Sequence, residues 1–438
     1  KLADDEDMTD LSVVENGMIF LGLVGIMDPP RPEVKEAIRI CQDAGIKVKM
    51  ITGDHHMTAS AIGQELSISG SEDEPVSGAD LRSMSDDELS NSVEKAIFSR
   101  VTPDQKMRIV SSLQEQGEIV AMTGDGVNDA PALSGANIGI AMGIAGTDVA
   151  KDAADMVLQD DNFANIVHAV EEGRKIYQNI RNFVRYQVST NVAAVALIVI
   201  STFIFGWELP LTATQILVIN ILMDGPPAVA LGVEKRHGKV MERPPRPVDE
   251  GLPNGRDIAL IFYLGAVMVI GTLIVFFLAG GGVYGNECSL APFATEADAG
   301  FSVDDCSAGD EAALSAWDSY ADTTFADAQT MTFAVFIVFQ LFNVLNCRSD
   351  KDSLFRLGLF SNKAINYAIL ASGFLLFLFV HYATFQIPLI GIEFGNLLST
   401  TPLESVDWVV LIAVASTVFL IEEFRKLMMN SGFFSVRR

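Results

Sequence analysis

The sequence has 438 residues, 49% of them hydrophobic and 20% charged, and its formal net charge is −26. The length allows two or three units with separate cores, and the apolar composition indicates membrane segments. The acidic balance excludes a nucleic-acid partner, which needs clustered Lys and Arg, and favours a salt-rich cytoplasm in which repulsion between carboxylates is screened.

Residues 18 to about 160 have the pattern of an α/β domain. Short β-rich runs bounded by Gly, Pro and Asp predict strands over residues 18–26, 46–51 and 118–122. Helices are predicted from Pro32 to a stop at Gly45, and over residues 103–117. The alternation implies a parallel sheet whose ligands bind beyond the carboxyl ends of the strands. We expect the acidic stretch 70–92 to be an exposed excursion from this domain.

The second half has the pattern of a membrane protein. One long helix is expected from residue 162, charged at first as a stalk and then apolar. Six apolar segments, each close to the roughly 20 residues that cross a bilayer, lie at 184–205, 213–232, 257–279, 328–346, 364–384 and 406–423. The loops after the first, third and fifth segments contain no Lys or Arg, whereas the loops after the second and fourth are basic. By the positive-inside rule, the α/β domain, the basic loops and the C-terminus are predicted to face the cytoplasm.

Two predicted strands end with the same chemistry. Thr123-Gly124-Asp125 follows the strand 118–122, and Thr52-Gly53-Asp54 follows the strand 46–51. Parallel strands that end alike bring hydroxyls, backbone amides and carboxylates to one edge of the sheet. Carboxylates beside a phosphate repel it unless a hard cation lies between them, so Mg²⁺ is implied. Lys106, near the start of its helix, is placed to offset the charge of phosphoryl oxygens.

Several longer motifs resemble the phosphorylation domain of P-type cation-transporting ATPases. They are DPPRPEV (28–34), MITGDHHMTA (50–59), SRVTPDQKMRIV (99–110), AMTGDGVNDAPAL (121–133) and IGIAMGIAGTDVAKDAADMVL (138–158). The membrane half, with QILVINILMDGPPAVALGVE (215–234), resembles the calcium-pump branch. The likeness extends over essentially the whole chain. It implies a haloacid-dehalogenase-like α/β domain with a Rossmann-like parallel sheet, followed by an all-α bundle of six transmembrane helices.

The resemblance implies roles for individual residues. Asp125 is expected to bind Mg²⁺, with Asp129 as a further ligand, and Asn128 and Asp129 are expected to shape the phosphorylation site. Lys106 is expected to contact phosphate. The residues expected to line the nucleotide and phosphate site are Thr52, Gly53, Asp54, Arg100, Lys106 and Asn128. The implied reaction is Mg²⁺-dependent ATP hydrolysis coupled to cation translocation.

The same resemblance indicates an incomplete pump. The chain has no initiator Met, and it contains neither the Asp-Lys-Thr-Gly-Thr motif that carries the family's phosphorylated Asp nor the family's Thr-Gly-Glu motif. We therefore expect the C-terminal half of a pump, unable by itself to form a phosphoenzyme or to transport. Its expected partners are the lipid bilayer and the N-terminal half of the same pump, with the actuator domain, the nucleotide domain and the first four membrane helices.

The expected location is the plasma membrane of a salt-adapted prokaryote, with the α/β domain in the cytoplasm. The expected divisions are a remnant of the nucleotide domain or hinge at 1–17, a phosphorylation domain at 18–161, a stalk at 162–183, a membrane domain at 184–426 and a cytoplasmic tail at 427–438.

Polar side chains inside the apolar segments mark a candidate cation site, because such groups are costly in a bilayer. Asn220 and Asp224 lie four residues apart on one helix face, before a Gly-Pro-Pro sequence that interrupts the helix and frees carbonyl groups. Asn191, Gln340 and Asn343 are predicted to add neutral oxygens. Hydrogen bonding between helices is the alternative for these amides.

The predicted number of ions rests on a departure from part of the family. Two-site calcium pumps resemble this chain but carry acidic residues at the positions of Ala194 and Gln340, which are neutral here. One or two carboxylates with amide and backbone oxygens suit a single hard divalent cation, so we predict one Ca²⁺ per cycle, or Mn²⁺ in its place. A monovalent-cation (Na⁺, K⁺ or H⁺) pump and a membrane-anchored phosphatase-like or regulatory fragment stay open as other functions.

Two of the four cysteines, Cys288 and Cys306, lie in the long loop predicted to face outward. An oxidising exterior would allow a disulfide between them, and two unpaired thiols are the alternative.

Overall fold

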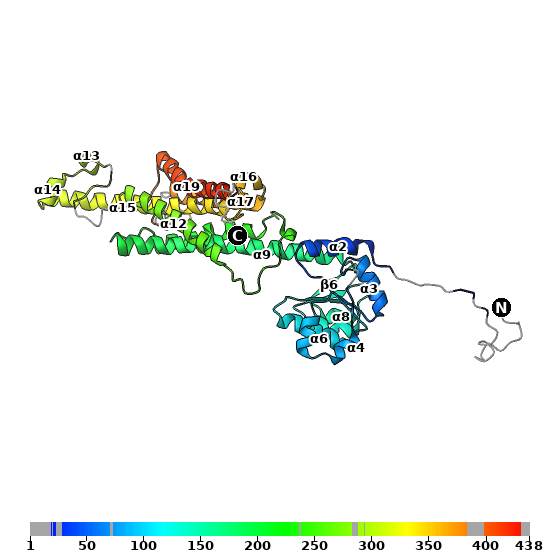
Figure 1. The fold of residues 1–438 in the computed structure, drawn as a ribbon. Coiled ribbons are helices and arrows are strands. Elements are labelled where there is room, and N and C mark those ends of the chain that lie inside the picture. The colour runs from blue at the N-terminus through cyan, green and yellow to red at the C-terminus, as the bar shows by residue number, and fades with distance from the viewer. Residues whose placement is uncertain are drawn as a thin grey trace. The chain divides into compact units, whose positions relative to one another are not determined.

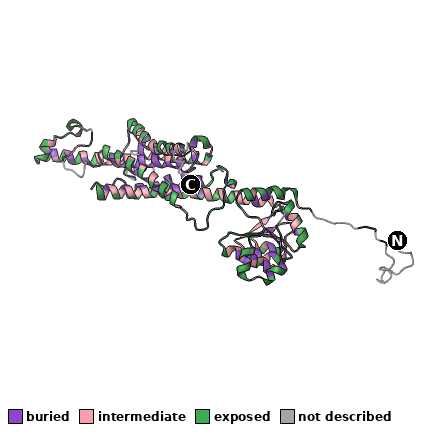
Figure 2. Cartoon of the chain, in the orientation of Figure 1, coloured by how far each residue is buried: buried purple, intermediate pink, exposed green. Residues whose placement is uncertain are grey.

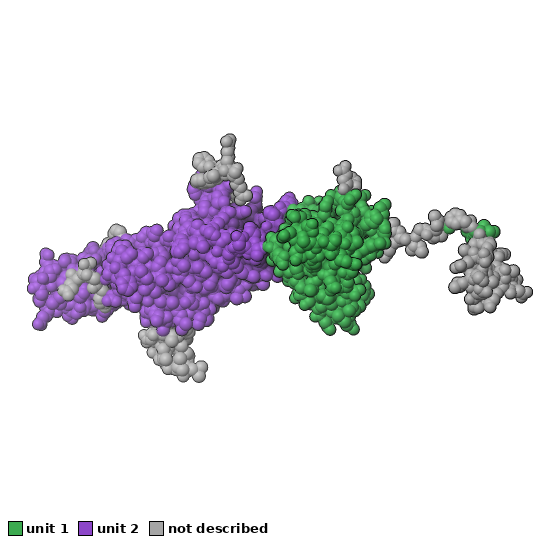
Figure 3. Space-filling view, turned by 60° about the horizontal axis from the view of Figure 1, so that its bottom comes forward, with its two compact units in different colours: residues 1–165 green, residues 166–438 purple. Residues whose placement is uncertain are grey.

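The structure is a computed structural model that describes residues 19, 21–22, 29–70, 73–235, 238–282, 288–292, 294–382 and 398–430. It divides into two compact units, residues 1–165 and residues 166–438, drawn in green and purple in Figure 3. The predicted strand 18–26 and the segments 1–17 and 427–438 fall wholly or largely outside the described residues.

The described strands of the first unit form two three-stranded parallel sheets. One has the order β1-β3-β2, from β1 (Met50–Ile51), β3 (Ile97–Ser99) and β2 (Val76–Ser77). The other has the order β4-β5-β6, from β4 (Ala121–Gly124), β5 (Ile138–Met142) and β6 (Met156–Leu158). The predicted parallel pairing is confirmed within each sheet. The two strands that end in Thr-Gly-Asp, β1 and β4, belong to different sheets, so the expectation that both ends lie at one edge of a single sheet is not confirmed. The strand predicted at 46–51 is shorter than expected, since only its last two residues pair.

Helices flank these strands (Figure 1). They are α2 (Pro32–Asp43), α3 (His56–Glu65), α4 (Gly78–Ser83), α5 (Asp86–Ser92), α6 (Pro103–Glu115), α7 (Ala130–Gly135) and α8 (Asp148–Ala153). Both predicted helices begin at a proline, whose fixed φ suits the first turn. Each is followed within two residues by a glycine in the left-handed region, Gly45 at φ +74° and Gly117 at φ +82°.

The acidic stretch 70–92 is not the exposed excursion that its charge predicts. Its described part contributes β2, α4 and α5, and the side chains of Val76, Leu81 and Leu89 are buried in the core of the unit. Four of the acidic side chains, Asp80, Asp86, Asp87 and Glu88, lie instead in the first turns of α4 and α5, where Asp80 completes a capping box with Ser77. Burial of these three apolar side chains thus keeps the segment in the fold despite its high charge.

The first unit closes at Asp161, which adopts a left-handed conformation (φ +53°) shortly before the next helix. Its carboxylate accepts hydrogen bonds from the amides of Ile144 (2.9 Å) and Ala145 (2.8 Å). The bond from Ile144 lowers the pKa of Asp161, against the opposing effect of burial. The guanidinium of Arg31 donates to the Asp161 carbonyl at 2.6 Å, so the loop after β5 and the start of α2 are both fastened to this residue.

The second unit is helical. Its elements are α9 (Ala164–Val199), a π-helical turn (Ile200–Ile204), α10 (Ala213–Val218), a second π-helical turn (Ile219–Met223), α11 (Gly225–Gly232), a 3₁₀ turn (Val240–Glu242), α12 (Gly255–Leu278), α13 (Glu296–Ala299), α14 (Val303–Ser307), α15 (Glu311–Asn346), α16 (Leu354–Leu357), α17 (Lys363–His381) and α19 (Ser405–Asn430).

Six helical spans among the described residues are long and apolar enough to cross a membrane, as predicted. They are Ala164–Ile204, Ala213–Gly232, Gly255–Leu278, Glu311–Asn346, Lys363–His381 and Ser405–Met429. The first joins the predicted stalk and crossing without a break. The fourth begins well before the predicted residue 328. Buried residues gather where these helices pack together (purple in Figure 2), above all on α15, where every side chain from Phe333 to Phe339 is buried.

Cys288 and Cys306 form a disulfide, with their Cα atoms 5.6 Å apart. The bridge belongs to a small apolar cluster with Phe301 and Trp317, at the part of α15 that extends beyond the predicted crossing. The sequence left the pairing open, and the structure shows the two cysteines joined within this cluster.

We predict that neither cysteine reacts with a thiol reagent in intact, unreduced vesicles, and that both react after a reductant is added. In the loop-entropy model a bridge of this span stabilises the segment by about 3 kcal/mol, so Cys288→Ser should make the segment more sensitive to proteolysis. Mass-spectrometric mapping of the labelled peptides measures the reaction of each cysteine before and after reduction. Labelling of either residue before reduction contradicts the bridge.

Candidate active site and cation site

The loops after β1 and β3 are bonded to each other. The Val101 amide donates to the carbonyl of Thr52 (3.2 Å), and the Arg100 amide donates to the carbonyl of Asp54 (3.2 Å). Arg100 adopts a left-handed conformation (φ +51°), an uncommon one for a residue other than glycine. The side chains of Asp54 and Arg100 are exposed, so the structure brings the predicted Thr-Gly-Asp loop and Arg100 together at one open edge.

Two histidines that the sequence analysis did not single out follow this loop. The rings of His55 and His56 lie 4.2 Å apart, and Nδ1 of His55 accepts the Met57 amide (3.3 Å) at the start of α3. Partial desolvation, with His56 and Arg100 nearby, lowers the pKa of His55. A neutral His55 suits its role as an acceptor for a helix start.

Asp129 organises the second loop. Its Oδ1 lies 2.6 Å from Nζ of Lys106, and its Oδ2 accepts the amides of Asp125 (3.3 Å) and Gly126 (3.1 Å). A Cβ at Gly124 would lie 2.4 Å from Cβ of Asp129, so this position admits only glycine without movement. The Asp129 side chain is nearly buried, and it holds both the turn after β4 and the lysine of α6.

Asp125 differs from Asp129 in being available to a ligand. Its side chain and that of Asn128 are exposed, whereas both oxygens of Asp129 already accept hydrogen bonds. Among the described residues, no group of three His, Cys, Asp or Glu side chains gathers into a ready metal site. Asp125 fits Mg²⁺ as a single protein carboxylate, since Mg²⁺ is commonly held by one or two carboxylates, water and substrate phosphate.

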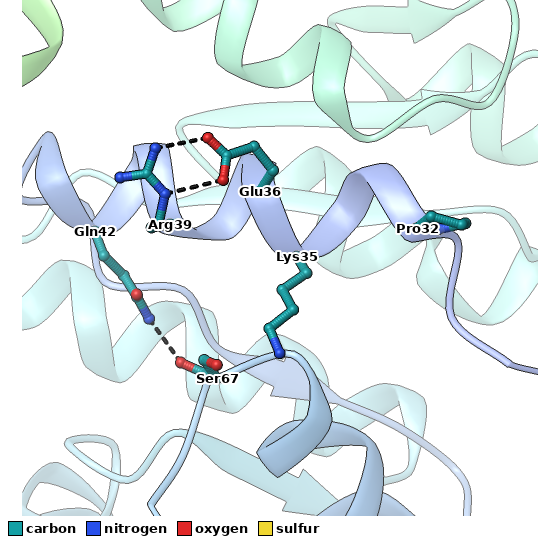
Figure 4. Close-up of a pocket in the computed structure, with 6 residues that line it drawn as sticks. All are labelled: Pro32, Lys35, Glu36, Arg39, Gln42 and Ser67. Atoms are coloured by element: carbon teal, nitrogen blue, oxygen red, sulfur yellow. Dashed lines mark hydrogen bonds and ion pairs between the residues drawn. The ribbon is translucent and has the colours of Figure 1, made fainter.

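A pocket of about 310 Å³ lies elsewhere on this unit (Figure 4). It is lined by Pro32, Lys35, Glu36, Arg39, Gln42 and Ser67. Arg39 is paired with Glu36 (2.6 Å), and Gln42 donates to the Ser67 carbonyl (2.9 Å), as the dashed lines in Figure 4 mark. None of the predicted site residues lines this pocket, so it adds no residue to the candidate active site.

The second candidate site centres on Asp224, which is fully buried. Its Oδ1 accepts the hydroxyl of Tyr186 (3.1 Å), and its Oδ2 has no hydrogen-bond partner among the described atoms. The residue joins a π-helical turn to α11, and its amide donates five residues back, to Ile219 (2.9 Å). Burial of a carboxylate oxygen without a hydrogen bond is costly, which makes Asp224 a candidate ligand for a cation.

The helix break leaves further oxygens without helical partners. Proline has no N–H, so Pro226 and Pro227 cannot donate to the carbonyls one turn before them. The carbonyl of Met223 instead meets the hydroxyl of Ser372 at 3.5 Å. The predicted release of backbone oxygens beside a carboxylate thus has a structural basis.

The amides of α15 differ in how they are satisfied. Asn343 is fully buried and donates to Ser189 Oγ (3.0 Å), a helix–helix bond of the kind that was the alternative to ligation. Gln340 is 1% exposed, and neither of its side-chain polar atoms has a partner among the described atoms. Gln340 therefore remains the stronger candidate for a ligand, because a buried amide without partners is rare in a native protein.

Asn191 and Asn220 are not brought into this buried cluster. Both side chains are exposed on the surface of the described chain, although each lies within a predicted crossing. Two residues of α9 that were not predicted as site residues, Tyr186 and Ser189, contact Asp224 and Asn343. The available signal was a cluster of polar residues at 186–191, interrupted only by Val188, at the start of a predicted crossing.

A haloacid-dehalogenase-like domain continued by six membrane-length helices defines an integral membrane protein of the P-type ATPase class. A family model described as the C-terminus of cation-transporting ATPases matches residues 208–428, and a haloacid-dehalogenase-like hydrolase model matches residues 3–137. The first match covers half of the chain, which therefore belongs to the cation-transporting ATPase family.

Similar proteins carry names of calcium pumps. Calcium-transporting ATPase 1 of Schizosaccharomyces pombe is 40% identical over 421 residues, which are 94% of this chain and 41% of that protein. Calcium-transporting ATPase type 2C member 2 of Homo sapiens is 40% identical over 413 residues, which are 94% of this chain and 38% of that protein. The chain thus spans about two-fifths of the length of the curated relatives that it matches.

Proposed function

We propose that the chain is the C-terminal part of an ATP-driven pump that exports Ca²⁺, or Mn²⁺, from the cytoplasm. The observation that carries this proposal is the buried Asp224 beside a broken helix, with one carboxylate oxygen that has no hydrogen-bond partner in the described part of the chain. The similarity of the chain to calcium-transporting ATPases supports the choice of Ca²⁺ as the transported ion. The rest of the pump, including the phosphorylated aspartate, would come from a segment N-terminal to this one.

The residues of the first unit have defined tasks in this proposal. Mg²⁺ held by Asp125 would neutralise charge on the nucleotide phosphates. Lys106, oriented by Asp129 at 2.6 Å, supplies a fixed positive charge for phosphoryl oxygens. Asn128 lies exposed beside Asp125, and the loop of Thr52, Gly53 and Asp54 with Arg100 would line the nucleotide side.

We propose a single ion site built on Asp224 and Gln340, with backbone oxygens of the helix break. Ala194 and Gln340 supply no charge, so the described helices offer one buried carboxylate to the ion at this place. Asn220 and Asn191 belong to the site only if the N-terminal half covers the surface on which they lie. Oxygen ligands and one or two carboxylates suit Ca²⁺ or Mn²⁺.

The proposed location is the plasma membrane of a salt-adapted prokaryote, with the first unit and the basic loops in the cytoplasm. The distribution of Lys and Arg among the loops supports the orientation, and the net charge of −26 supports the adaptation to salt.

The proposal is tested by ion uptake into vesicles that contain the full-length protein. We expect one Ca²⁺ or Mn²⁺ taken up per ATP hydrolysed, because one buried carboxylate serves one divalent ion. Parallel assays of radioactive Ca²⁺ uptake and phosphate release measure the ratio. A ratio near two excludes the single site, and activation by Na⁺ or K⁺ without divalent uptake excludes the ion assignment.

A further inference from the structure

A buried arginine lies just after the end of α15, the helix that carries Gln340. Arg348 is completely buried two residues after α15, and all five of its N–H donors are used. Nε and Nη2 donate to the two carboxylate oxygens of Glu234, at 2.9 and 3.0 Å. The remaining donors go to the carbonyls of Gly358 (3.1 Å) and Leu359 (3.2 Å) and to Ser361 Oγ (2.5 Å).

Glu234, its partner, lies just beyond α11 and is equally buried, with 1% of its side chain exposed. Its Oε2 also accepts the side-chain amide of Asn362 (2.9 Å), which contacts the carbonyl of Ala230 as well (3.3 Å). Asn179 of α9 donates to the carbonyls of Gly232 (3.0 Å) and Glu234 (3.1 Å). These bonds satisfy the last carbonyls of α11 and fix its end.

The third helix that contributes to the Asp224 cluster, α9, also forms hydrogen bonds beside the Glu234–Arg348 pair. Asn182 of α9 donates to the carbonyl of Arg348 (2.9 Å), and Arg185 donates to the carbonyl of Cys347 (2.9 Å). One turn further along α9 is Tyr186, the partner of Asp224. All three elements that supply the cluster, α9, α11 and α15, therefore meet at one buried ion pair.

The short length of α11 links this ion pair to Asp224. The helix has eight residues, so it is a stiff segment of about 12 Å. Asp224 immediately precedes it and Glu234 follows two residues after it, while the π-helical turn before Asp224 allows bending there, so Asp224 moves with α11. A shift at Glu234 therefore moves the carboxylate of Asp224 relative to Gln340.

We propose that the Glu234–Arg348 ion pair is a positioning device that fixes α11 against α15 and thereby sets the cation affinity of the Asp224 cluster. The proposal rests on the proposed cation transport. Stability alone does not account for the pair, since an apolar pair of similar volume often stabilises a protein equally well. A bidentate pair with defined geometry instead fixes one register between two helices.

Equilibrium binding of radioactive Ca²⁺ to the full-length protein tests the proposal, in Arg348→Met, Glu234→Gln and the double variant. Each single variant should raise the half-saturating Ca²⁺ concentration about 10-fold, the usual effect of losing a group that orients metal ligands. The double variant should match the single ones, because both substitutions remove the same interaction.

Lys426→Met is the matched control. Lys426 is fully buried and pairs with Glu423 (3.2 Å) on α19. It also donates to the carbonyl of Asn346 (3.2 Å) at the end of α15, so its partners lie on α19 and α15 rather than on α11. The Lys426→Met variant should lower the melting temperature as Arg348→Met does, but it should leave the Ca²⁺ affinity unchanged. An unchanged affinity in folded Glu234→Gln protein, or an equal loss of affinity in Lys426→Met, overturns the positioning role. Absence of Asp224-dependent Ca²⁺ binding in the unsubstituted protein instead overturns the proposed function.

Discussion

Asp224→Asn in the full-length protein should abolish Ca²⁺-dependent ATP hydrolysis and weaken Ca²⁺ binding by more than about 100-fold. The reason is that Asp224 is the buried carboxylate at the break before α11, and one of its oxygens accepts no hydrogen bond from the described residues. An amide keeps the size and the bond to Tyr186 but removes the charge that a hard cation needs. ATP hydrolysis at a series of Ca²⁺ concentrations measures the loss.

For the same variant we expect a loss of Ca²⁺ binding but no loss of thermal stability. Without cation, a buried unpaired charge is unfavourable, so Asp224→Asn should melt at the same temperature as the unsubstituted protein or higher. Added Ca²⁺ should raise the melting temperature of the unsubstituted protein only, by linkage. Asp322→Asn, an exposed position of α15, is the control and should behave as the unsubstituted protein. Retained Ca²⁺ protection in Asp224→Asn contradicts the assignment.

Local signals predicted much of the fold. Pro32, Pro103 and the glycines that follow α2 and α6 set helix limits through backbone geometry that a neighbour rarely overrides. The six crossings were predicted because bilayer thickness demands a minimum apolar length. The acidic segment 70–92 was predicted wrongly, because charge density hides a few buried anchors such as Leu81.

The candidate site was predicted in type but not in detail. Periodicity places Asn220 and Asp224 on one helix face, yet a π-helical turn lies between them, and only Asp224 is buried. Asn343 bonds to a neighbouring helix, which no pattern within its own segment reveals. The Glu234–Arg348 pair joins residues 114 positions apart, and a contact of that range depends on how the helices pack. Local patterns indicate which residue types gather, and packing decides which of them meet.

Asp125→Ala in the full-length protein should reduce Mg²⁺-dependent phosphorylation from ATP by at least about 100-fold, the usual loss when one preorganised electrostatic contact is removed. Asp125 is the exposed carboxylate at the end of β4, while Asp129 is occupied by Lys106 and two amides. The variant should therefore fold normally, because the bonds that hold the turn come from Asp129. Acid-stable phosphoprotein formed from labelled ATP measures the effect.

Two comparisons separate this role from a general effect of removing charge. Asp87→Ala removes an exposed carboxylate from the first turn of α5, away from the strand-end loops, and should leave phosphorylation unchanged. Asp129→Ala should instead destabilise the domain, since it leaves Lys106 without its partner and frees the turn at Gly126. Loss of a buried paired charge costs about 3 to 5 kcal/mol, which thermal unfolding detects. Normal phosphorylation of Asp125→Ala at ordinary Mg²⁺ concentration would contradict the assignment of the metal to Asp125.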